Sequence, residues 1–148
     1  MPNIVRNVLA VLAGLVVCGA VNVTLITLGP SLIPPPPGVD MTTTEGLSKA
    51  MPLLEPRHFI MPFLAHALGS LAGALVAYLI AASYRTQMAY VIGAFHLAGG
   101  VAASFMIPAP KWFIALDLVA AYLPMAWLGI QVGTRMKQGK PAPRQSEA

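Results

Sequence analysis

Four apolar runs, separated by short polar segments, occupy most of the chain. They cover Ile4–Leu28, Phe59–Ser83, Met88–Ile107 and Trp112–Gly133. A helix needs about 20 residues to cross a hydrocarbon layer about 30 Å thick, and each run has that length. The pattern predicts an all-α integral membrane protein, with a four-helix bundle within residues 1–137 and almost no soluble part.

The longest connection, residues 30–58, has the features of an ordered outer loop. Pro34–Pro37 is a four-proline run, which favours an extended polyproline II segment. Thr42 and Glu45 have the spacing of a helix capping box, and Glu45 and Lys49 are spaced for a helical ion pair. We therefore expect a short helix from about Thr43 to Met51 on the outer surface. Ligand binding is an alternative role for this loop.

The other two connections are short turns, Tyr84–Gln87 and Pro108–Lys111, so the helices that they join are expected to be antiparallel neighbours. Residues 138–148 are rich in Gly, Pro and charge and are expected to form a disordered tail.

Composition and charge support the membrane prediction. The chain has 57% hydrophobic and only 9% charged residues, whereas soluble domains average about 25% charged residues. The net charge of +4 does not indicate nucleic-acid binding, because the cations flank the apolar runs. One side would hold six (Arg6, Arg85, Arg135, Lys137, Lys140 and Arg144) and the other three (Lys49, Arg57 and Lys111). The positive-inside rule then places both termini in the cytoplasm.

Small residues recur at helical spacing within the apolar runs. Gly69 and Gly73 lie in the second run, and Gly129 and Gly133 in the fourth. Small residues let helix backbones approach closely in lipid, so we expect these glycines to pack the bundle. The alternative is that one seam, with Gly129 and Gly133 as the first candidate, serves a homo-oligomer or a partner subunit.

Four polar side chains lie inside the apolar runs, one in each: Asn22, His66, His96 and Asp117. At about 1.5 Å per helical residue, all four lie at a similar depth in the outer half of the membrane. Polar groups in lipid usually face the bundle interior, so we expect one shared network. On the fourth run, a single inward stripe would hold Asp117, Ala120, Ala121, Pro124 and Leu128.

Three interpretations of this network remain open. It fixes the helix register through a bond between Asp117 and a histidine, it relays protons or binds a cation, or it binds a metal. The residues lack the spacing of known metal motifs, so metal binding is unknown, and no cofactor is indicated. No Ser/His/Asp order or HExxH motif predicts a hydrolase, and Cys18 is interpreted as a small packing residue.

Several segments also resemble a group of uncharacterised small bacterial inner-membrane proteins with four spans. They are Pro34–Asp40, Glu55–Ile60, Pro62–Gly69 and Asp117 with Tyr122–Trp127. The resemblance implies a bacterial inner-membrane location and brings no activity. The sequence as a whole favours a structural or accessory membrane protein without catalytic activity, and the alternative is a small oligomeric transporter or channel for protons or cations.

Overall fold

The computed structural model describes residues 2–138. Helices joined by loops and turns make up this part of the chain, and it contains no strands. The helices are α1 (Asn3–Leu32), α2 (Thr44–Ala50), α3 (Ile60–Ile80), α4 (Arg85–Met106), α5 (Lys111–Ala120) and α6 (Leu123–Gln138). Two 3₁₀ turns, η1 (Met51–Leu53) and η2 (Pro56–Phe59), connect α2 to α3. Four helical segments, α1, η2–α3, α4 and α5–α6, are long and apolar enough to cross a membrane. The predicted all-α class is confirmed.

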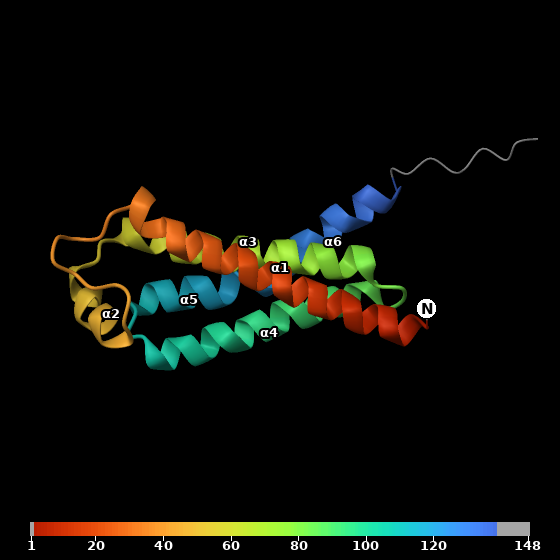
Figure 1. The fold of residues 1–148 in the computed structure, drawn as a ribbon, viewed down its shortest axis with the longest axis horizontal. Coiled ribbons are helices and arrows are strands. Elements are labelled where there is room, and N and C mark those ends of the chain that lie inside the picture. The colour runs from red at the N-terminus through yellow and green to blue at the C-terminus, as the bar shows by residue number, and fades with distance from the viewer. Residues whose placement is uncertain (1, 139–148) are drawn as a thin grey trace, which may run out of the picture.

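Helix α3 lies at the centre of the bundle and contacts α1, α4, α5 and α6. The long helices run side by side along the longest axis of the molecule, and α2 lies at the end opposite the N-terminus (Figure 1). Helix α6 continues the direction of α5 toward the end that holds the N-terminus. Both ends of the described chain therefore lie at the same end of the bundle.

Small residues make the close approach of these helices possible. A Cβ atom added to Gly73 would lie 2.6 Å from the backbone oxygen of Gly14 on α1. Added to Gly129, it would lie 2.6 Å from the backbone oxygen of Leu71 on α3. Gly69 is similarly close to α1, and Gly133 to Tyr78 on α3. The seam of Gly129 and Gly133 thus packs against α3 of the same chain.

The fourth apolar segment is a broken helix, which the sequence-based prediction of one continuous span missed. Helix α5 ends at Ala120 and α6 begins at Leu123. Pro124 has no N–H to donate to the carbonyl of Ala120, which explains a break at this point. The break also changes the inward face. Tyr122 and Ala126 are completely buried, whereas Pro124 and Leu128, which we expected to face inward, are exposed.

The end of the bundle that holds the N-terminus is tied together by polar side chains on backbone groups. The Asn7 side-chain oxygen accepts hydrogen bonds from the N–H groups of Ala82 and Ser83. Arg6 donates to the carbonyl of Ile80, and Arg85 to that of Ala81. These bonds fix the turn at residues 81–84, so α4 begins at Arg85 and includes most of the predicted turn 84–87.

The outer loop contains the expected short helix, with a different start. Thr43, and not Thr42, caps α2, because its hydroxyl accepts from the N–H of Gly46 at 3.0 Å. Thr42 instead donates its N–H and hydroxyl to Asp40 at 2.7 and 2.6 Å. These hydrogen bonds hold the pKa of Asp40 below its usual range. The predicted ion pair of Glu45 and Lys49 is present at 2.7 Å.

The predicted tail at 138–148 lies almost entirely outside the described residues. Its first residue, Gln138, is the last residue of α6.

Candidate functional site: a buried polar centre below an apolar cavity

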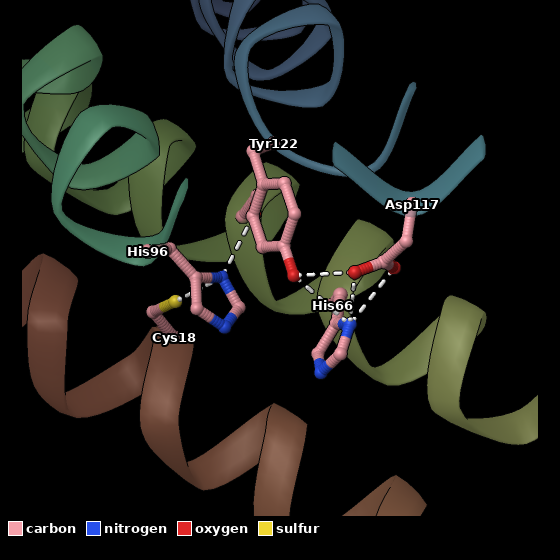
Figure 2. Close-up of polar contacts among 6 residues, drawn as sticks. Cys18, His66, His96, Asp117 and Tyr122 are labelled. Atoms are coloured by element: carbon pink, nitrogen blue, oxygen red, sulfur yellow. Dashed lines mark hydrogen bonds and ion pairs between the residues drawn. The ribbon is translucent and has the colours of Figure 1, made fainter. Parts of the chain in front are cut away.

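A histidine and an aspartate from different helices form the centre of the polar site. His66 on α3 places its Nδ1 2.8 Å from Oδ1 and 3.0 Å from Oδ2 of Asp117 on α5. Only 5% of Asp117 is exposed. Figure 2 shows the two side chains facing each other across the gap between their helices. The contact that we expected between Asp117 and a histidine is therefore made by His66.

Tyr122 completes this centre, and the sequence analysis did not find it. Its hydroxyl donates to Oδ2 of Asp117 at 2.6 Å and lies 3.1 Å from Nδ1 of His66. In a continuous helix, residues 117 and 122 would point about 140° apart, so the periodicity placed them on different faces. The break before Leu123 brings them together. Pro124 was the sequence signal that could have indicated it.

His96 on α4 belongs to a second, adjacent group. Its Nδ1 lies 2.9 Å from the hydroxyl of Ser70 and 3.2 Å from the sulfur of Cys18. The His96 ring lies edge-on to the rings of His66 and Tyr122, with centroids 5.7 and 5.1 Å away. No hydrogen bond within residues 2–138 connects His96 to His66 or Asp117. Cys18 is thus a polar contact of His96 as well as a packing residue (Figure 2).

Asn22 on α1 does not join the centre. It is half-buried and lies beside Gly69 on α3. A Cβ atom added to Gly69 would be 3.6 Å from the Cβ atom of Asn22. Its side chain makes no hydrogen bond within the described part of the chain. The four expected members thus divide into a bonded pair, an adjacent histidine and an unbonded amide. Equal depth along four helices did not establish contact, because it leaves the rotation of each helix undetermined.

Only one ring nitrogen of His66, Nδ1, contacts Asp117. When Asp117 is ionised it only accepts hydrogen bonds, and Nδ1 of His66 is then the donor. The other nitrogen, Nε2, points away from Asp117 and Tyr122 (Figure 2), and no described residue binds it. It is not among the enclosed, unsatisfied polar atoms, so it is accessible. In the neutral ring Nε2 is a hydrogen-bond acceptor, and in the protonated ring it is a donor.

An apolar cavity of about 260 Å³ lies between this pair and the outer loop. His66 and Asp117 contribute to its lining, and the other polar side chains in the lining are those of His58 and Ser104. The remaining walls come from α1, α2, η1, η2, α3, α4 and α5 or their flanks. They include Ile26 of α1, Leu47 of α2, Met51 of η1, Ala103 of α4 and Phe113 of α5. The cavity thus has apolar walls and one acidic–basic pair.

The described residues offer little for metal binding or nucleophilic catalysis. Residues 2–138 contain no group of three His, Cys, Asp or Glu side chains arranged to hold a metal ion. Cys18 and Ser70 are buried against His96 and do not line the cavity. Ser104 lines the cavity, and its hydroxyl donates to the carbonyl of Val101 rather than to a histidine. The arrangement can therefore exchange a proton or hold a polar group at Nε2 of His66.

Comparison of the chain with protein-family models, curated proteins and solved structures finds no match in any of the three. The resemblance to small bacterial four-span proteins stays an expectation from the sequence.

Proposed function

We propose that this chain is an integral membrane protein with four spans that acts as a structural or accessory component without catalytic activity. The four long apolar helices support membrane insertion. The charge bias supports placing both termini in the cytoplasm, and the resemblance supports a bacterial inner membrane. Its proposed partners are the lipid bilayer and either a second copy of the chain or another membrane protein. We do not propose nucleic acid as a partner.

The hydrogen bonds of Asp117 are the observation that carries the structural role. One carboxylate receives a bond from His66 on α3 and another from Tyr122 at the break before α6. An unpaired carboxylate in lipid would cost several kcal/mol, of the order of 3 or more. The bonds therefore select one arrangement of α3, α5 and α6, and favour this bundle over others that leave Asp117 unpaired.

The proposal of a non-catalytic role is supported by how the reactive groups are separated. Nε2 of His66 is the accessible base, but no hydroxyl or thiol of the described chain is bonded to it. Cys18 and Ser70 contact a different histidine, which does not line the cavity. A nucleophile and its base need to be within hydrogen-bond reach of each other and of a substrate.

A second candidate function is a small oligomeric transporter or channel for protons or cations. It is favoured by one observation, the accessible Nε2 of His66 beside a buried carboxylate, since such an imidazole can take up and release a proton. His96 and Asn22 would extend the path. The lack of a hydrogen bond from His66 or Asp117 to either residue favours the structural role.

The two candidates are separated by measuring proton movement in proteoliposomes that hold a pH-sensitive dye. The structural proposal predicts that an imposed pH gradient decays no faster than in protein-free liposomes. Asp117→Asn, which keeps a hydrogen-bond acceptor, and Asp40→Asn, a matched change in the outer loop, should then behave alike. A flux that wild type and Asp40→Asn support, and that a folded Asp117→Asn variant lacks, would establish the transporter instead.

Native mass spectrometry from mild detergent tests the partner proposal. It reports a homo-oligomer, a co-purifying membrane protein or retained ions in one measurement. Retained cations would count against the structural role, whereas a protein partner without ions would support it.

A further inference from the structure

We propose that the apolar cavity binds a neutral, largely apolar molecule that ends in a single hydroxyl, and that this hydroxyl donates a hydrogen bond to Nε2 of His66. The binding site goes beyond the structural role proposed above. It requires no movement of protons and no catalytic step.

The walls of the cavity determine the character of the ligand's body. Met51, Ala103 and Phe113 come from three different parts of the fold and present carbon atoms to the same space. The volume of about 260 Å³ is near the lower end of the range for small-molecule pockets, about 300–1,000 Å³. Such a space suits a short alkyl chain, because burying apolar surface is favourable by about 25 cal/mol per Å².

The polar end of the cavity determines the ligand's head. When an ionised Asp117 accepts from Nδ1 of the neutral His66 ring, Nε2 is an acceptor, and it has no partner in the described chain. A hydroxyl is the smallest neutral group that can donate to this nitrogen. Tyr122 is already engaged, because its hydroxyl donates to Asp117.

Charge distinguishes a hydroxyl from other heads. A carboxylate would be brought close to Asp117, and two like charges in a medium of low dielectric constant repel strongly. An alkane would leave Nε2 without a hydrogen bond. An ammonium head would have to lose its water among mostly apolar walls, which is costly for a charged group. The neutral hydroxyl therefore fits this site best.

The outer loop forms the cover of the cavity. Leu47 of α2 and Met51 of η1 contribute to the lining, and His58 lies within 3.2 Å of the carbonyl of Pro34 across the loop. A ligand held between this cover and His66 would contact both the loop and the bundle.

The proposal is tested by titrating the full chain in lipid nanodiscs with 1-octanol, octanoate, octylamine and n-octane. The readouts are the dissociation constant and the ¹⁵N signals of the histidine rings. We expect 1-octanol to bind in a saturable way and to shift the Nε2 signal of His66 more than its Nδ1 signal. Preference for octanoate, octylamine or n-octane, or no saturable binding of 1-octanol, would overturn the proposal.

Three variants locate the site. Ala103→Leu adds bulk to a residue that lines the cavity, whereas Ala102→Leu makes the same change at an exposed neighbour on α4. We expect Ala103→Leu to weaken 1-octanol binding by about tenfold or more, and Ala102→Leu to leave it unchanged. His66→Phe, which keeps an aromatic ring but has no acceptor atom, should weaken binding about tenfold. Equal affinity for 1-octanol in wild type and in folded Ala103→Leu would place the binding elsewhere and contradict the proposal.

Discussion

Nδ1 of His66 and Oδ1 of Asp117 lie 2.8 Å apart, although 51 residues separate them in the chain. Their bond joins α3, the central helix of the bundle, to α5, which has few other contacts with α3. Tyr122 adds the start of α6 to the same carboxylate. One side chain therefore connects three helical segments.

Removing the Asp117 carboxylate should destabilise the bundle more than neutralising it. Asp117→Ala leaves the donors of His66 and Tyr122 without an acceptor, and we expect it to lower the free energy of unfolding in detergent by about 1–3 kcal/mol. Asp117→Asn keeps an acceptor oxygen and should recover most of this loss. The measurement is denaturant unfolding followed by circular dichroism. Equal stability of the Ala and Asn variants would mean that hydrogen bonding to residue 117 is unimportant.

The glycines at helix crossings should not accept larger side chains. In Gly73→Leu the side chain would collide with the backbone of Gly14, so the thermal stability should fall by the equivalent of about 1–3 kcal/mol. Gly129→Leu should behave in the same way against Leu71. The control is Gly99→Leu on α4, because no atom lies within 4 Å of its added Cβ. If all three variants unfold at one temperature, the crossings are wrongly placed.

The proposed topology places α2 outside the cell and the end of α6 inside. In a Cys18→Ala background, Thr44→Cys should react with an impermeant thiol reagent in intact cells, because Thr44 is exposed at the start of α2. Gln138→Cys, exposed at the end of α6, should react only after the cells are opened. Labelling of the second site alone in intact cells would reverse the orientation.

The start of α2 should be sensitive to acid. Hydrogen bonds from Thr42, and then from Thr43, lower the pKa of Asp40 in the folded loop. The ionised carboxylate therefore stabilises the loop above its ordinary pKa of about 3.9, and this contribution is lost as the pH falls through the lower pKa of the folded state. Backbone NMR shifts of residues 42–46 should report fraying in that range. Asp40→Asn should remove the pH dependence; an identical acid transition in this variant would assign it to another group.

How much of the fold could be predicted depended on the kind of signal. The length and apolar character of the runs were sufficient to predict the four helical segments that could span a membrane, but not the break between α5 and α6. The helix bounds were less accurate. Asn7 fixes the turn before α4 by accepting from the N–H of Ala82, far along the chain, and Arg85 fixes it by donating to the carbonyl of Ala81. Such contacts leave no local pattern in the sequence.

The polar centre was only partly predictable. His66 and Asp117 were found because ionisable residues in apolar runs are rare and costly. Tyr122 was missed because tyrosine is common in such runs and carries no charge there. Asn22 was included on depth alone, and its rotation about α1 keeps it out of the hydrogen bonds. Predicting Tyr122 would have required treating Pro124 as a complete break in the helix rather than a kink.

A double-mutant cycle between His66 and Asp117 tests most directly that their bond holds the bundle in one arrangement. The free energy of unfolding would be measured for wild type, His66→Ala, Asp117→Ala and the double variant in the same bicelles. The account predicts that the losses of unfolding free energy in the two single variants, added together, exceed the loss in the double variant. The expected difference is about 0.6–2 kcal/mol, the range for polar pairs within membrane proteins. Losses that add to within about 0.3 kcal/mol would show that the two residues do not stabilise each other, and would contradict the structural role assigned to the pair.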